Sequence, residues 1–264
     1  MGILHICGKW KLEVKGNSET AAVEIGGERA VRHETRLAHL SHNSWAFYTL
    51  TKRIRGVNSV IDYCAGLGMW ATIILHELEP KKLILNDIDE ACANHLKEIF
   101  SPGVVTVRHG SYFSVIEEPF DLVCMDITIH TAKRSLVRDP GKLAPEIPLL
   151  KILKLDPKYV IISDCAAGKL HLNKKCYEEV LGANISDYDE YLTAFSRYLF
   201  STSKYFIDAV VKCGNRERPH SSYLLLKKGI PDAPWEPIHD LGMAGGYRDS
   251  WVESTKPFAL GDVS

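Results

Sequence analysis

Two kinds of hydrophobic pattern alternate along the chain. Short apolar runs rich in β-branched residues predict seven strands, at residues 59–63, 82–86, 104–108, 121–126, 158–163, 205–212 and 221–227. Longer segments with apolar residues at helical spacing predict helices, at residues 34–55, 69–79, 89–100, 173–182 and 187–202. Strands that alternate with helices favour a mostly parallel sheet with helices on both faces.

The last two predicted strands follow a different rule. Only residues 213–220 lie between them, which is too short a connection for a helical crossover. These two strands are therefore predicted to pair antiparallel. The expected fold is α/β: a seven-stranded, mostly parallel Rossmann-like sheet with a C-terminal antiparallel β-hairpin.

The pattern also divides the chain into three segments. Residues 1–33 contain Gly16-Asn17 and Gly26-Gly27, which predicts an N-terminal extension with a short hairpin or irregular structure. Residues 34–229 hold the alternating elements and form the predicted domain. Residues 230–264 are rich in proline and glycine and lose periodicity, so a C-terminal tail is expected, packed on the domain or flexible.

Composition narrows the class of protein but names no partner. With 45% hydrophobic residues, 25% charged residues and a net charge of -1, the chain is typical of a soluble globular protein. No apolar stretch approaches the roughly 20 residues of a membrane helix, and the N-terminus does not resemble a signal peptide. We expect a cytoplasmic protein. The seven cysteines form no Cys-x-x-Cys pair and no zinc-type cluster, so no metal site is predicted.

A glycine-containing loop follows the first strand of the predicted domain. Asp62 ends that strand, and Gly66 and Gly68 let the backbone approach a ligand before a helix begins at Met69. The second strand ends at Asp87, about 20 residues later, where a carboxylate can accept hydrogen bonds from both hydroxyls of a ribose. The spacing predicts a nucleotide-cofactor site.

Two motifs carry a resemblance to a known family. Asp62-Tyr-Cys-Ala-Gly-Leu-Gly68 and Leu85-Asn-Asp-Ile-Asp89 are similar to the first and second motifs of class I S-adenosylmethionine-dependent methyltransferases. The resemblance covers roughly residues 40–228 and implies S-adenosyl-L-methionine as cofactor. The form Asp-x-x-Ala-Gly-x-Gly is nearer to the nucleic-acid methyltransferases of this family.

The resemblance also implies roles for individual residues. The loop around Gly66 and Gly68 would pass along the methionine part of the cofactor, and Asp87 would bind the ribose. His109-Gly-Ser-Tyr-Phe113 resembles the segment that holds the adenine. The implied cofactor-binding residues are Asp62, Ala65, Gly66, Gly68, Asp87, Ile88, Ser111, Tyr112 and Asp126.

A dehydrogenase is the competing interpretation of this loop. The dinucleotide fingerprint Gly-x-Gly-x-x-Gly tolerates alanine at its third position, and here the series runs from Gly66 through Gly68 to Ala71. The predicted closing hairpin favours the methyltransferase.

Catalytic candidates lie after the fourth and fifth strands. Methyl transfer requires mainly that nucleophile and methyl group be held in line, and an acceptor nearby can orient an amine or hydroxyl. Asp126 and His130 lie at the end of the fourth strand. The alternative to a catalytic role is that Asp126 caps a loop and that His130 is an ordinary surface residue. Asp164 and Cys165 follow the fifth strand. Cys165 resembles the nucleophile of pyrimidine C5 methyltransferases, or else is a small residue that fills a tight turn.

The neighbouring sequence and the charge pattern bear on the substrate. Asp126-Ile-Thr-Ile departs from the Asn/Asp-Pro-Pro-aromatic signature of amino-methylating nucleic-acid enzymes. Residues 1–58 hold nine Lys/Arg against five acids, and a second basic run spans residues 133–142. These two basic segments favour a phosphate-bearing substrate such as RNA or DNA, although a solvated charged face would have the same composition.

The leading function is therefore an S-adenosylmethionine-dependent methyltransferase (EC 2.1.1 class) that acts on a nucleic acid or nucleotide. Two alternatives stay open: a methyltransferase for small molecules or proteins, and a non-catalytic, methyltransferase-like binding subunit. The sequence leaves the methylated atom and the oligomeric state undetermined.

Overall fold

The computed structural model describes residues 2–7, 9–14, 44–110, 118–125, 148–164, 170–214, 219–229 and 237–244. The chain forms two compact units, Met1–Val115 with Ala244–Ser264 and Ile116–Met243.

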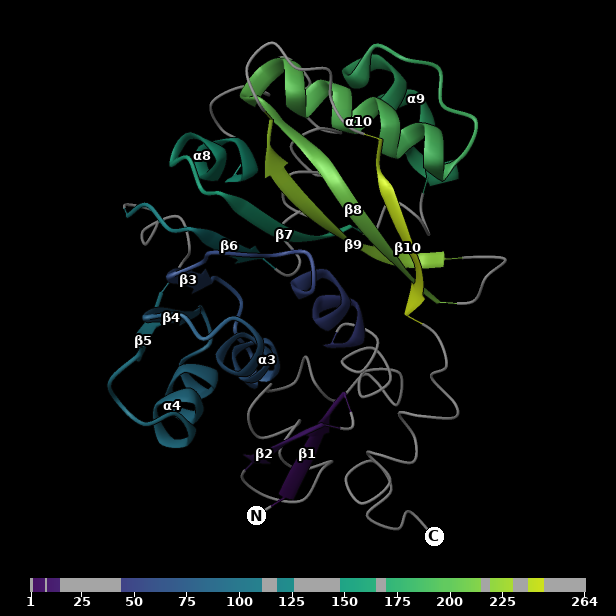
Figure 1. Ribbon diagram of the computed structural model, residues 1–264. Coiled ribbons are helices and arrows are strands. Elements are labelled where there is room, and N and C mark those ends of the chain that lie inside the picture. Colours follow the sequence, from purple (N-terminus) through teal and green to yellow (C-terminus); the bar gives the residue numbers. More distant parts are fainter. Residues whose placement is uncertain are drawn as a thin grey trace, which may run out of the picture. The chain divides into compact units, whose positions relative to one another are not determined.

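Three parallel strands form the centre of the first unit (Figure 1). Strands β3 (Ser59–Asp62), β4 (Lys82–Asp87) and β5 (Val105–His109) pair in that order, all in parallel. Helices α3 (Met69–Glu77) and α4 (Glu90–Ile99) connect them. Parallel strands need such crossovers, and their middle residues are buried, as the continuous apolar runs predict.

A small hairpin lies at the start of the chain. Strands β1 (Gly2–Ile6) and β2 (Trp10–Val14) pair antiparallel, and the Lys9 N–H closes the turn by donating to the Ile6 carbonyl at 3.0 Å. A hairpin is therefore present, but its turn lies between Ile6 and Trp10, whereas the Gly16-Asn17 and Gly26-Gly27 pairs on which the prediction rested lie outside the described residues. Residues 44–51 are helical and fall within the predicted helix 34–55, of which 34–43 also lie outside them.

The second unit contains the predicted hairpin. Strand β6 (Leu122–Met125) pairs in parallel with β7 (Tyr159–Asp164). Strand β9 (Pro219–Lys228) runs antiparallel to both β7 and β8 (Tyr205–Gly214), so the last strand of the pair lies between the other two. The expected α/β fold class, mostly parallel with an antiparallel hairpin near its end, is confirmed.

Two elements of the second unit were not predicted. Helix α8 (Pro148–Lys154) lies where a connection was expected. Proline fits the first turn of a helix, and four of the residues after it are buried apolar side chains, which stabilises this short helix: Leu149, Leu150, Ile152 and Leu153. Strand β10 (His239–Ala244) lies beside β8, within the predicted tail, and is the eighth strand from β3 onward among the described residues, where seven were expected. Its residues are half-buried or exposed, and Gly242 interrupts its short apolar stretch, so the sequence pattern did not mark it as a strand.

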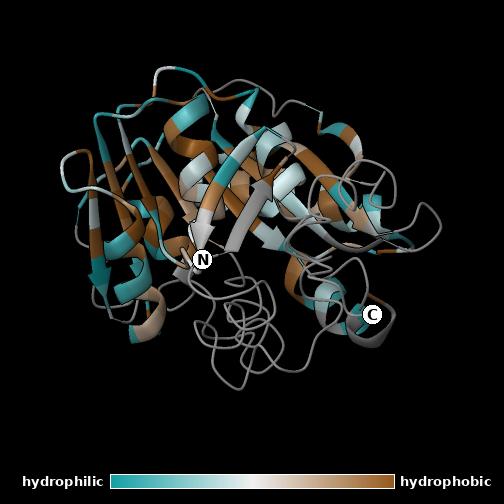
Figure 2. Ribbon diagram, turned by 90° about the horizontal axis from the view of Figure 1, so that it is seen from below, coloured by the Kyte–Doolittle hydropathy of each residue, from teal (hydrophilic) through white to brown (hydrophobic). Residues whose placement is uncertain are grey.

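Helices α9 (Leu170–Leu181) and α10 (Tyr188–Ser203) follow β7. The Asp187 carboxylate caps α10 by accepting from the Glu190 N–H at 2.9 Å. Figure 2 shows hydrophobic residues along the strands and hydrophobic and hydrophilic residues together on the helices. Every helix in the described parts of the chain is too short or too polar to span a bilayer.

One hydrogen bond joins α10 to β8 inside this core. The buried Ser196 Oγ accepts from the Ile207 N–H at 2.9 Å. Ser196→Ala is expected to lower the free energy of unfolding by about 1.5 kcal/mol, because the N–H loses its acceptor while it stays buried. Urea denaturation measures the change. Ser201→Ala is the control, since this exposed hydroxyl bonds only a helix carbonyl. Equal losses in the two variants would contradict the prediction.

Candidate functional site

A tight loop, residues 63–68, connects β3 to α3 in the first unit. Gly66 and Gly68 have φ angles of +52° and +83°, in the left-handed region that favours glycine. The Gly68 N–H donates to the Ala65 carbonyl at 2.8 Å, and the Ala65 N–H donates to the Asn86 carbonyl at 3.0 Å. The loop is thus folded on itself and fixed to β4.

Gly68 also lets this loop lie against α4. A Cβ at this position would come within 2.6 Å of the Phe100 ring and 3.0 Å of the Leu96 side chain. Gly68 is the N-cap of α3 and offers no side chain to cap it, so the first turn of the helix directs its N–H groups toward the loop.

The Asp87 carboxylate holds the loop from the end of β4. Its Oδ2 accepts from the Gly66 N–H at 2.8 Å, and its Oδ1 accepts from the Asp89 N–H at 2.9 Å. Burial raises the pKa of Asp87, although these N–H groups oppose the shift. An ionised carboxylate has about four acceptor positions, so this half-buried side chain can accept further hydrogen bonds from a ligand.

An apolar side chain lies next to this acceptor. Ile88 is 67% exposed and, with Val104, makes up the exposed large hydrophobic residues in the described part of the chain. The His109 Nε2 lies 3.2 Å from the Ile88 carbonyl, so the end of β5 contacts this segment. A carboxylate beside an exposed isoleucine provides the polar and apolar contacts that a nucleoside requires.

Two buried side chains, those of Asp62 and Asn86, hydrogen-bond the backbone of the loop after β3. The Asp62 Oδ1 accepts from the Cys64 N–H at 3.3 Å. The Asn86 Nδ2 donates to the carbonyls of Tyr63, at 3.4 Å, and Gly110, at 3.1 Å, which joins the loops after β3 and β5 to β4. Asn86 was not among the predicted residues. The sequence feature that could have identified Asn86 is that it is a single amide residue at the end of an apolar run.

The structure thus brings several of the predicted residues together. Around the loop after β3 lie Asp62, Ala65, Gly66, Gly68, Asp87 and Ile88. The other predicted site residues of this region and of the loops after β6 and β7 lie outside the described residues: Ser111, Tyr112, Asp126, His130 and Cys165.

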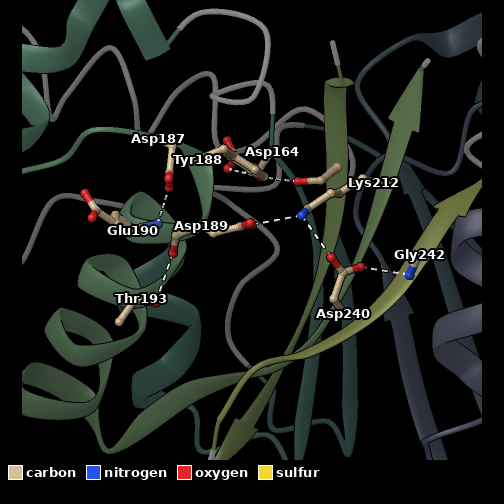
Figure 3. A network of polar contacts seen from close by, with 10 residues as sticks. Asp164, Asp187, Tyr188, Asp189, Glu190, Thr193, Lys212, Asp240 and Gly242 are labelled. Carbon is tan, nitrogen blue, oxygen red and sulfur yellow. Dashed lines mark hydrogen bonds and ion pairs between the residues drawn. The ribbon is translucent and has the colours of Figure 1, made fainter. Parts of the chain in front are cut away.

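Asp164, the remaining catalytic candidate, lies in the second unit (Figure 3). It ends β7 and is fully buried, and its Oδ2 accepts from the Tyr188 hydroxyl at 2.9 Å. The same hydroxyl bonds Ser222 on β9. Tyr188 and Ser222 were not predicted, because they come from elements far apart in the sequence: strand register places Ser222 opposite Asp164, and Tyr188 comes from α10.

A second group of charges nearby holds β10. The Lys212 Nζ lies 2.8 Å from Asp189 and 2.9 Å from Asp240, joining β8 to α10 and β10 (Figure 3). Burial lowers the pKa of Lys212, but the hydrogen bonds to both carboxylates outweigh it and raise the pKa. This group is structural. Over the described ranges, no three His, Cys, Asp or Glu side chains could together hold a metal ion.

No family model and no curated protein matches this chain. The solved structures similar to it include methyltransferases. The methyltransferase domain of bacterial CtHen1 is 13% identical, with 70% of this chain and 99% of that chain covered and a TM-score of 0.46. The ribosomal protein L11 methylase of Lactobacillus delbrueckii subsp. bulgaricus is 15% identical, with 72% and 79% covered and a TM-score of 0.45. The O-methyltransferase TomG of Streptomyces achromogenes, in complex with SAM, is 15% identical, with 82% and 92% covered and a TM-score of 0.46.

Proposed function

We propose that this chain is a cytoplasmic S-adenosylmethionine-dependent methyltransferase that acts on a nucleic acid or nucleotide. The observation that carries the proposal is the Asp87 carboxylate, which braces the Gly66 N–H at 2.8 Å and keeps acceptor capacity for a ligand. This carboxylate lies at the carboxyl ends of parallel strands, where ligands of open α/β sheets bind.

Each residue around the loop has a role in this proposal. Asp87 accepts hydrogen bonds from the ribose hydroxyls, and Ile88 packs against the adenine. The backbone at Gly66 and Gly68 admits the methionine part, because glycine itself has no side chain to stand between the backbone and the ligand. When bound, the cofactor supplies an electrophilic methyl group. The protein holds the nucleophile in line with that group and excludes water.

Asp126, His130 and Cys165 remain candidates for the residues that contact the substrate. We assign Asp164 a positioning role, because a fully buried carboxylate bonded to Tyr188 is suited to fixing neighbouring groups. Ser111 and Tyr112 complete the proposed adenine site. The excess of basic residues in segments 1–58 and 133–142 supports a phosphate-bearing substrate.

Two measurements test the proposal. Isothermal calorimetry should detect binding of S-adenosylmethionine and of S-adenosylhomocysteine. If neither binds, the proposed methyltransferase function is wrong. Transfer of a tritiated methyl group is then measured to RNA, DNA, protein and metabolite pools. If the tritiated methyl group appears only in protein or only in metabolites, the proposed nucleic-acid substrate is wrong and the substrate belongs to the labelled class. Cofactor binding without transfer to any pool would indicate a non-catalytic subunit.

Cofactor affinity is expected to depend on pH through Asp87. Burial raises the pKa of this carboxyl above its ordinary value of 3.8, so it gains its proton earlier than a surface aspartate as the pH falls. The ionised form accepts ribose hydroxyls best, so affinity should fall as the pH drops through the raised pKa. Calorimetry between about pH 4.5 and 8 measures the fall. Asp87→Asn should show a flat profile, and the same fall in that variant would contradict the assignment.

A further inference from the structure

Two lysine side chains converge on one tyrosine ring in the first unit, away from the cofactor loop. The Lys9 Nζ lies 4.4 Å from the centroid of the Tyr48 ring, and the Lys52 Nζ lies 4.3 Å from the same centroid. Lys9 also hydrogen-bonds the Tyr48 hydroxyl. Lys9 belongs to the turn between β1 and β2, whereas Tyr48 and Lys52 come from the helix at residues 44–51 and the turn after it. We call these three residues the lysine–tyrosine cluster.

Further aromatic rings surround the cluster. The Trp10 ring contacts Tyr48 edge-on, with centroids 5.6 Å apart, and stacks on the His76 ring, with centroids 5.5 Å apart and planes at 7°. The Trp45 ring lies 5.8 Å from Tyr48. Trp10, Trp45 and Tyr48 are half-buried, so each keeps part of its surface in solvent.

Positive charge in the cluster is only partly balanced. Lys52 pairs with Glu77, while Lys9 makes no ion pair with a carboxylate anywhere in the described part of the chain. The hydrogen bond from Lys9 lowers the pKa of Tyr48, as expected for a phenol next to ammonium groups. Both lysines are exposed. Both ammonium groups lie close to the Tyr48 ring, and a bound anion would be attracted to their positive charge.

We propose that the lysine–tyrosine cluster and Trp10 bind a single-stranded nucleic acid, the ammonium groups contacting phosphates and the exposed aromatic surface contacting a base. This inference rests on the proposed function and locates the substrate-binding surface. Cationic side chains interleaved with aromatic ones are the combination that single strands require, because phosphates need charge and unpaired bases need stacking partners. An acidic peptide would use the charge but would leave the rings without a stacking partner.

The position of the cluster suits such a substrate. His76 and Glu77 lie in the last turn of α3, and the cofactor loop lies at the other end of the same helix. A helix of nine residues is about 13 Å long, so one extended strand can contact the cluster and still reach the cofactor end.

Fluorescence anisotropy tests this inference with the full chain and a fluorescein-labelled, mixed-sequence single-stranded 12-mer of RNA or DNA. The variant Lys9→Gln/Lys52→Gln should bind about 10-fold more weakly at 0.1 M salt. Its plot of log affinity against log salt should be shallower by about 1.4, since two phosphate contacts at about 0.7 each are lost.

Two exposed lysines of the second unit provide the matched control. Lys154→Gln/Lys175→Gln removes the same charge from α8 and α9 and should leave the salt slope unchanged. The inference would be overturned by an unchanged salt slope in the Lys9/Lys52 variant or by an equal change of slope in the control variant. It would also be overturned if the original protein bound heparin as tightly as it binds the 12-mer. Unchanged S-adenosylmethionine affinity and melting temperature show that the variants are folded.

The two proposals can fail separately. If S-adenosylmethionine binds but neither 12-mer does, this inference is wrong and the methyltransferase stands. If the 12-mer binds with the expected slopes but S-adenosylmethionine does not, the surface is supported as a nucleic-acid site and the proposed function fails.

Discussion

Replacing Asp87 with alanine is expected to weaken S-adenosylmethionine binding by at least about 150-fold, or about 3 kcal/mol. Hydrogen bonds to a charged acceptor contribute about 1.5–3 kcal/mol each, and the proposal gives Asp87 two of them to the ribose. The same change removes the acceptor of the Gly66 and Asp89 N–H groups, so the loop also loses its support from β4. Isothermal calorimetry measures the loss.

The control for this variant is Glu90→Gln, which removes an exposed carboxylate three residues further along the chain. It should leave the affinity unchanged, because the net charge of the region alone does not bind the cofactor. Asp87→Asn separates the two roles of Asp87: it keeps the size of the side chain but loses the charge, so an intermediate loss is expected. If Asp87→Ala binds the cofactor as well as the original protein, the cofactor assignment is wrong.

Gly68→Ala is expected to lower the free energy of unfolding by about 3 kcal/mol, or roughly 8 °C in melting temperature. The φ angle of +83° strains any residue with a Cβ, and that Cβ would lie 2.6 Å from the Phe100 ring. The loop would have to move away from α4, so S-adenosylmethionine binding should weaken as well. Thermal unfolding followed by circular dichroism measures the first effect.

Gly182→Ala is the matched control for backbone strain. Its φ angle is +63°, but a Cβ there has no atom within 4 Å, so only about 1 kcal/mol should be lost. The difference between the two variants isolates the clash. Gly68→Ala/Phe100→Leu should be less destabilised than the two single changes added together, since a smaller side chain at position 100 makes room. Strict additivity would show that Phe100 does not cause the loss.

Much of the first unit could be predicted because its signals are local. The runs at β3 and β4 are apolar because parallel strands are buried on both faces, and each ends in an acid followed by a turn or a helix. The loop from Asp62 to Gly68 needed glycine for its backbone angles, which the sequence displays directly. Asn86 was missed because a buried amide resembles any other polar residue until its partners are known.

Other features could not be predicted, because their partners are distant in the sequence. Strand β10 is half-buried or exposed, contains Gly242 and is held by Lys212 from β8, so its own residues carry little strand signal. Asp164 and Ser222 face each other because β9 pairs with β7 in this register, and Tyr188 reaches both from the start of α10. Helix α8 begins with a proline in a segment that resembles a loop, and it is stabilised by burial of its leucines.

The sequence by itself determined the alternating strands and helices other than α8 and β10, the antiparallel hairpin and the glycine loop with its acid, since periodicity, connection length and glycine are properties of neighbouring residues. Only the tertiary structure decided that Asp87 braces Gly66, that Gly68 must make room for Phe100, and that Lys9 and Lys52 converge on Tyr48. Each of these contacts joins segments separated along the chain, and packing of the core sets such distances.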